Sequence, residues 1–130
     1  MLLVYPVLDS GVSTESMKKF VDTPVWNSIL NRKMWQLYLP EKVDGQNAQY
    51  VSPASASDLS NMPPTYIQTA EFDCLHDEGV AFADALESAG NSVALDETKG
   101  TVHGFDMASH STITATAVNN RISFLNQIFE

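Results

Sequence analysis

Residues 65–79 read TYIQTAEFDCLHDEG, and this stretch decides the fold. β-Branched and aromatic residues follow two prolines directly over Thr65 to Ala70, which predicts a buried strand. A polar loop then leads into a helix predicted from Asp77 to Ser88, with apolar residues spaced for one buried face and Gly90 placed to end it. A strand followed at once by a helix is typical of an α/β protein.

The segments on either side continue this order. Ser92 to Thr98 is predicted to be a strand, and a final helix is predicted over Thr112 to Phe129 from apolar residues at intervals of three and four. Upstream, Leu2 to Tyr5 is an apolar run stopped by Pro6, which indicates a strand buried on both faces. We therefore expect an α/β fold with about three parallel strands, flanking helices and right-handed crossovers.

The segment 10–50 has a different pattern. Ser13-Thr14-Glu15-Ser16 can cap a short helix, and a helical spacing follows in four apolar residues: Val25, Trp26, Ile29 and Leu30. Two or three small helices fit there. Glu41 to Gln49 is polar and is predicted to be a loop, and the Ser-, Ala- and Asp-rich stretch 52–61 is predicted to be a surface connection.

Size and charge limit the classes of partner. A chain of 130 residues forms one domain, and its 44% of apolar residues is typical of a globular protein. The net charge is -9, which repels nucleic acid and anionic lipid. Residues 51–130 carry this excess, with two basic and eleven acidic side chains that are dispersed as on a solvated acidic surface.

The location is predicted from the cysteine count and the opening residues. Cys74 is the only cysteine, so no intramolecular disulfide and no Cys-based metal site can form. The first eight residues are apolar but lack a basic n-region and a cleavage site, and no stretch approaches the roughly 18 apolar residues that span a bilayer. We expect a cytoplasmic protein without a membrane span.

Residues with catalytic chemistry follow two neighbouring strands. Asp73 lies just past the strand that ends at Ala70, and His103 lies past the strand that ends near Thr98. Loops at the carboxyl ends of adjacent parallel strands lie close together. An ionised Asp that accepts the Nδ1 proton of a His fixes its tautomer, as a general base requires. The sequence therefore predicts an Asp–His pair that lacks a nucleophile.

No residue of this sequence matches the pattern of an activated nucleophile well. Gly90-Asn91-Ser92-Val93-Ala94 comes nearest to G-x-S-x-G, but it lacks the last glycine and passes from helix to strand, whereas a nucleophile elbow turns from strand to helix. Cys74 neighbours Asp73, but no feature of the sequence indicates an activated thiol. His76, His103 and His110 lack the spacing of metal sites, so we expect no metal and no cofactor.

The order of the motifs resembles a known family. The chain is similar, over nearly its whole length, to the C-terminal part of the hormone-sensitive-lipase-like esterases, members of the α/β-hydrolase fold. The resemblance rests on these segments in this order: Tyr5-Pro6-Val7-Leu8-Asp9, Tyr50-Val51-Ser52-Pro53, Pro63-Pro64, Thr69-Ala70-Glu71-Phe72-Asp73, Leu75, Asp77-Glu78-Gly79 and His103-Gly104-Phe105.

The resemblance implies roles for particular residues. Residues 1–130 would form a partial α/β-hydrolase domain, in which 51–130 carry the loops of the triad acid Asp73 and the triad base His103. Residues 10–50 would belong to the helical cap over the active site. Three aromatic side chains could then approach an acyl chain: Trp26, Trp35 and Tyr38. The family often has Pro where this chain has Cys74, a departure that leaves the carboxylate of Asp73 in place.

The family's other motifs are missing. Its nucleophile lies in G-D-S-A-G-G and its oxyanion hole in H-G-G-G, and neither motif occurs in this sequence. We therefore expect no nucleophile in this chain. A serine needs a base within hydrogen-bond reach, and the oxyanion needs preorganised N–H donors, which Asp73 and His103 cannot supply.

The resemblance implies a serine carboxylesterase that acts on short or medium acyl esters. The missing motifs leave three interpretations of this chain. The chain is an incomplete esterase that is inactive alone, or a subunit of a split enzyme that pairs with the nucleophile half along its first strand, or a non-catalytic remnant that binds a partner or an acyl ligand. In each case an uncovered first strand exposes Leu2, Leu3 and Val4, which predicts poor solubility or dimerisation of the isolated chain.

Overall fold

A parallel three-stranded sheet forms the centre of the computed structural model, which describes residues 1–39 and 47–129. The strands are β1 (Leu2–Val4), β2 (Thr65–Ala70) and β3 (Val93–Thr98), in the order β1-β2-β3. All three were predicted. β1 stops one residue earlier than expected, because Tyr5 has a φ of 48° and so leaves the extended conformation.

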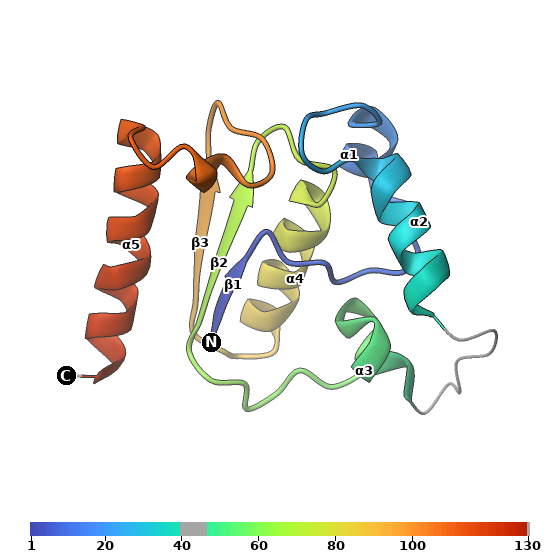
Figure 1. Ribbon diagram of the computed structural model, residues 1–130. Coiled ribbons are helices and arrows are strands. Elements are labelled where there is room, and N and C mark those ends of the chain that lie inside the picture. Colours follow the sequence, from blue (N-terminus) through green and yellow to red (C-terminus); the bar gives the residue numbers. More distant parts are fainter. Residues whose placement is uncertain (40–46, 130) are drawn as a thin grey trace.

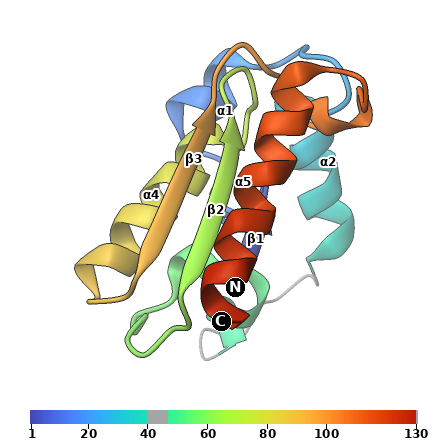
Figure 2. The same ribbon diagram turned by 90° about the vertical axis from the view of Figure 1, so that its left-hand side faces the viewer.

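Two long helices cover opposite faces of this sheet. Figures 1 and 2 show α4 (His76–Ser88) on one face and α5 (Thr112–Phe129) on the other. Both helices lie within one residue of their predicted bounds. The main core forms between α4 and the sheet, where one cluster of side chains is almost excluded from solvent: Leu8, Ile67, Phe82, Ala83 and Leu86. This arrangement is the predicted α/β fold.

The predicted small helices of residues 10–50 are α1 (Glu15–Lys19), α2 (Ser28–Tyr38) and α3 (Ala48–Val51). Thr14 caps α1 by accepting a hydrogen bond from the backbone of Met17, as the sequence indicates. The expected helical run from Val25 is wrong, because Val25 has a φ of 69° and Asn27 caps α2 just before Ser28.

Two loop predictions have mixed outcomes. The expected loop at 41–49 lies outside the described residues except for its end, where α3 already begins at Ala48. The stretch after it includes the short helix η2 (Pro53–Ser55), and the remainder of 52–61 is irregular, as predicted. Figure 1 shows α1 and the beginning of α2 near the end of the sheet toward which β2 and β3 point.

α4 lies close to β2 because residue 79 is a glycine. A Cβ atom built at Gly79 would lie 2.6 Å from Cγ2 of the buried Thr69. Alanine ordinarily favours a helix over glycine by about 1 kcal/mol, but here the contact forces neighbouring atoms to move at a cost of roughly 1–3 kcal/mol. We therefore expect Gly79→Ala to lower the free energy of unfolding by about 1 kcal/mol in urea denaturation.

The matched background for this substitution is Thr69→Ser, which removes the Cγ2 methyl group. In that background Gly79→Ala should have no destabilising effect, or should stabilise the helix. Equal destabilisation in both backgrounds would show that the close approach is not the cause.

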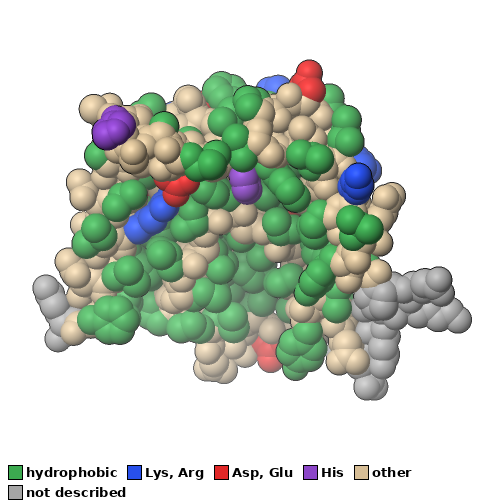
Figure 3. Space-filling view, viewed as in Figure 1, with side chains coloured by type: hydrophobic (Ala, Val, Ile, Leu, Met, Phe, Trp, Pro, Cys, Tyr) green, Lys and Arg blue, Asp and Glu red, His purple; other side chains and the backbone are tan. Residues whose placement is uncertain are grey.

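One edge of the sheet and the surface beside it are apolar. β1 pairs with β2 alone among the described strands, and Met1 and Leu2 are each 37% exposed. Figure 3 shows hydrophobic side chains gathered over the middle of this face, between α5 and the helices α2 and α3. Within the described residues, no helix combines the length and the apolar character required to cross a membrane.

Candidate active site

Asp73 and His103 meet at the carboxyl edge of the sheet. The loop after β2 places Asp73 three residues beyond the strand, where it is 1% exposed. The loop after β3 carries His103, and the two loops are joined by a 2.8 Å backbone hydrogen bond from Phe72 to Thr101. His103 Nδ1 lies 2.7 Å from Asp73 Oδ2. The carboxylate can only accept, so Nδ1 donates to it and Nε2 is left to exchange a proton.

The carboxylate itself is fixed by the backbone. Oδ1 of Asp73 accepts a hydrogen bond from the backbone N–H of Leu75 at 3.1 Å, which leaves Oδ2 directed at the imidazole. The His103 side chain keeps 21% of its surface exposed. A buried carboxylate that orients a partly exposed imidazole is the acid–base arrangement of a general base.

Aromatic rings surround the imidazole. The ring centroid of Tyr5 is 5.0 Å from that of His103, and the centroid of Trp26 is 6.0 Å from it. Gly104 follows with a φ of 70°, a conformation that glycine adopts without strain, and Phe105 packs edge-on against Tyr5. Tyr5 and Val25 have positive φ angles of 48° and 69°, in the left-handed region that non-glycine residues rarely adopt. Such strain is often found beside functional sites.

The three aromatic residues assigned to the acyl chain line one cavity. It has a volume of about 340 Å³, and its walls are almost entirely apolar: Val7, Trp26, Met34, Trp35, Tyr38, Tyr50, Val51 and Pro53. Trp35 is buried and packs edge-on against Tyr38, which is 62% exposed. The ring of Trp26 lies 6.0 Å from the ring of His103, measured between centroids, and Trp26 also lines the cavity. Trp26 therefore connects the cavity with the surroundings of His103, although neither His103 nor Asp73 lines it.

The local candidates for a nucleophile do not reach the imidazole. Ser92 directly precedes β3, whereas His103 follows the other end of that strand, so about 20 Å of extended chain separates them. Cys74 is fully buried. Burial, followed by the negative charges of Asp73 and Glu78, raises the pKa of the Cys74 thiol to about 12, so it stays protonated and unreactive.

Glu78 has a role that the sequence did not reveal. Asp77 and Glu78 stand in the first turn of α4, whose N-cap Leu75 makes no side-chain hydrogen bond. Glu78 Oε1 accepts hydrogen bonds from the backbone of Leu8 at 2.6 Å and Asp9 at 3.3 Å. Asp77 binds the backbone N–H of Ser16 at 2.7 Å. Both carboxylates thus hold the chain after β1 against α4.

The buried Glu78 makes stability depend on pH. Burial is the main cause that raises its pKa from 4.5 to about 7, and the hydrogen bonds from Leu8 and Asp9 oppose the rise only in part. The pKa of Glu78 is higher in the folded protein than in the unfolded chain. The contribution of Glu78 to the free energy of unfolding is therefore fully present below the pKa of the unfolded chain and is lost as pH rises through about 7. We expect the free energy of unfolding to fall by roughly 3 kcal/mol between pH 4.5 and 8 from this group.

Glu78→Gln should remove this fall, so the variant should unfold at higher urea concentration than the wild type at pH 8 but not at pH 5. Glu87→Gln, which changes an exposed carboxyl on the same helix, is the matched control. A difference between wild type and Glu78→Gln that is constant from pH 5 to 8 would contradict the assignment.

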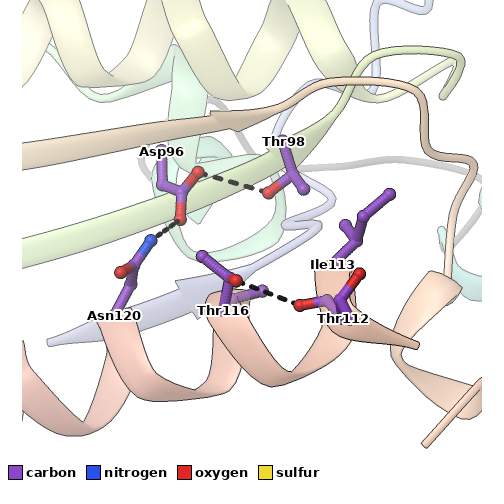
Figure 4. Close-up of a pocket in the computed structure, with 7 residues that line it drawn as sticks. Asp96, Thr98, Thr112, Ile113, Thr116 and Asn120 are labelled. Carbon is purple, nitrogen blue, oxygen red and sulfur yellow. Dashed lines mark hydrogen bonds between the residues drawn. The ribbon is translucent and has the colours of Figure 1, made fainter. Parts of the chain in front are cut away.

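A second cavity, of about 220 Å³, lies between β3 and α5 and has polar side chains in its lining, among them Asp96 and Asn120. Figure 4 shows Asp96 bound there by Thr98 and Asn120. Tyr66 and Gln68 also donate to this carboxylate. Burial raises the pKa of Asp96, but these four hydrogen bonds outweigh it and hold the pKa below its usual value. The carboxylate is therefore fully engaged within the protein.

A parallel α/β sheet that carries an Asp–His pair on neighbouring loops at its carboxyl edge is an arrangement that α/β-hydrolases have. The chain belongs to the α/β-hydrolase fold family, which matches residues 1–107. The resemblance to the hormone-sensitive-lipase-like esterases is confirmed at this level, because the similar proteins are carboxylesterases.

Two curated relatives illustrate the similarity. Carboxylesterase NlhH of Mycobacterium tuberculosis is 35% identical over 111 residues, which cover 80% of this chain and 33% of the relative. Ethyl acetate hydrolase of Pseudomonas putida is 32% identical over 104 residues, which cover 80% of this chain and 32% of the relative. The chain thus spans about a third of the length of these relatives.

The solved structures agree. A bacterial heroin esterase superposes with a TM-score of 0.91 at 35% identity, covering 97% of this chain and 41% of that one. A thermostable esterase from Pseudomonas putida superposes with a TM-score of 0.81 at 33% identity, covering 89% of this chain and 38% of that one. The arrangement of the sheet and helices is therefore that of an esterase over the residues matched.

Proposed function

We propose that this chain supplies the acid and the base of a serine carboxylesterase, with Asp73 and His103 in those roles. The observation that carries the proposal is the 2.7 Å contact between His103 Nδ1 and the buried carboxylate of Asp73. The two residues stand in the loops where the fold places catalytic groups, and the similar proteins are esterases.

The mechanism assigns one step to each group. His103 Nε2 takes the proton of a serine hydroxyl as that oxygen attacks the ester carbonyl, and it then gives the proton to the departing alcohol. Asp73 stays ionised, holds the imidazole and stabilises the imidazolium. The serine and the oxyanion donors come from residues outside this sequence, which lacks both motifs. Alone, the chain is inactive in this mechanism.

The nucleophile segment belongs either to a longer form of this chain or to a second polypeptide. The edge of β1 that pairs with no other described strand and the apolar face beside it offer the surface for such a segment, as the split-enzyme interpretation requires. The same edge accommodates a second copy when the segment is absent. The cytoplasmic location stays a prediction from the sequence.

Short or medium acyl esters are the proposed substrates. The cavity of about 340 Å³ that Trp26 connects with the surroundings of His103 has apolar and aromatic walls, which suit an acyl chain better than a charged or highly hydroxylated group. Residues 10–39 supply most of its aromatic side chains, in keeping with a role in the cap.

The test is a chimera, called here the completed enzyme, in which this chain replaces the matching 41% of the bacterial heroin esterase. We expect it to hydrolyse p-nitrophenyl butyrate with saturable kinetics. A folded chimera without turnover would overturn the proposal. Folding is checked by circular dichroism and by a cooperative thermal transition.

The cavity predicts a dependence on acyl length. Tyr38→Ala should lower kcat/KM for p-nitrophenyl hexanoate about tenfold in the completed enzyme while changing the value for the acetate less than about twofold, because only the longer chain reaches Tyr38. Leu37→Ala, an exposed change on the same helix outside the cavity, should affect both esters equally. Equal losses on both esters in Tyr38→Ala would remove this residue from the acyl site.

A further inference from the structure

Arg121 lies under the histidine loop and takes no part in the mechanism above. It is one of only two basic residues between 51 and 130, and its side chain is 15% exposed. From α5 its guanidinium donates to Gln68 Oε1 through both Nε and Nη2, with the Nε contact at 2.8 Å. Removing a guanidinium from water is costly, so its partners need good geometry to compensate.

Two further contacts of Arg121 lead toward His103. Nη1 lies 2.9 Å from Asp106 Oδ2, and Nη2 lies 3.4 Å from the hydroxyl of Tyr5. Asp106 belongs to the short helix η3 (Phe105–Met107), which begins directly after Gly104 and has no side-chain cap of its own. The salt bridge therefore ties the segment that follows the histidine to a long helix.

Tyr5 provides the second route to the imidazole. Its ring packs 5.0 Å from the ring of His103 and 5.6 Å from that of Phe105. Its backbone has a φ of 48°, which non-glycine residues adopt only when their surroundings enforce it. Burial, with Asp106 nearby, raises the pKa of Tyr5 above its usual range, so the hydroxyl stays neutral and accepts the bond from Arg121.

We propose that Arg121 is a positioning residue for His103. It fixes the imidazole through Tyr5 and through Asp106, while Asp73 fixes Nδ1. The role in catalysis rests on the proposed function, but the positioning of the ring does not. One guanidinium is needed, because its planar fork reaches three acceptors, which lie in β2, in η3 and directly after β1, and a lysine ammonium cannot do this.

The first test follows the Nδ1 proton of His103 by NMR in this 130-residue chain. Asp73→Asn identifies the signal. Arg121→Met should accelerate exchange of that proton with solvent about tenfold at a temperature well below unfolding, because the ring is less restrained. Arg121→Lys, which keeps the charge and is the safer variant for folding, should give a smaller increase in the same direction. Lys99→Met is the matched control in the histidine loop and should leave exchange unchanged.

The second test measures kinetics in the completed enzyme. Arg121→Lys should lower kcat about tenfold with KM unchanged, because a displaced base slows the chemical step without weakening ester binding. Exchange as fast in wild type as in both Arg121 variants would overturn the inference, whatever the kinetics. The completed enzyme and its variants could also hydrolyse no ester while the Arg121 variants of the 130-residue chain exchange the proton faster. That result would uphold the positioning of the ring and overturn only the proposed function.

Discussion

Asp73→Asn is expected to lower kcat of the completed enzyme about 10⁴-fold and to leave KM nearly unchanged. The amide fills the same buried space and still accepts the hydrogen bond from the backbone of Leu75 through its oxygen. However, the amide nitrogen cannot accept the Nδ1 proton, so His103 takes the tautomer in which Nε2 carries the proton and cannot act as a base. Initial rates on p-nitrophenyl butyrate provide the measurement.

The control for this substitution is Asp84→Asn, an exposed carboxyl on α4 that should leave kcat within about twofold of wild type, as surface changes usually do. Asp73→Asn with kcat within tenfold of wild type would show that another carboxylate orients the imidazole. Loss of the thermal transition in Asp73→Asn would instead identify a structural role for the buried group.

The second large effect concerns the chain by itself. We expect the isolated 130 residues to hydrolyse p-nitrophenyl butyrate no faster than the His103→Ala variant of the same chain. Neither the nucleophile motif nor the oxyanion motif of the family occurs in the sequence, and the groups in these motifs supply most of the acceleration of acyl transfer. Turnover that exceeds the variant and saturates with substrate would show that a residue of this chain serves as nucleophile.

Much of the fold was predictable because it depends on local pattern. The strand at Thr65–Ala70 and the helices near 76–88 and 112–129 follow from local runs and spacings of apolar residues. The meeting of Asp73 and His103 was predictable as well, because adjacent parallel strands place their following loops side by side. A rule of topology was sufficient there, without knowledge of any side-chain contact.

The missed features depend on contacts between distant residues. Glu78 binds the backbone 70 residues away, and Arg121 reaches Tyr5 across 116 residues. No local pattern distinguishes such a carboxylate from an ordinary helix-start charge, or such an arginine from a solvated one. The turn of the backbone at Val25 likewise went undetected, because tertiary packing overrode the helical spacing.

The aromatic cavity shows the same limit. Trp26, Trp35 and Tyr38 were assigned together through the resemblance to the esterases, and the structure brings them to one cavity with residues from after β1 and from α3. Their shared location depends on how α2 packs near the end of the sheet. Spacing within one helix gives the face of Trp35 and Tyr38 but says nothing of what lies opposite.

The most direct test of the central claim uses a fluorophosphonate probe, which marks an activated serine, followed by intact-mass analysis. It is applied to the isolated chain, to the completed enzyme and to the completed enzyme with His103→Ala. We predict one adduct on the completed enzyme, on a serine outside these 130 residues, and no adduct on the chain alone or on the His103→Ala variant. An adduct on a serine of the isolated chain, or labelling that persists after His103→Ala, would contradict the assignment of this chain as the acid–base part of a serine esterase.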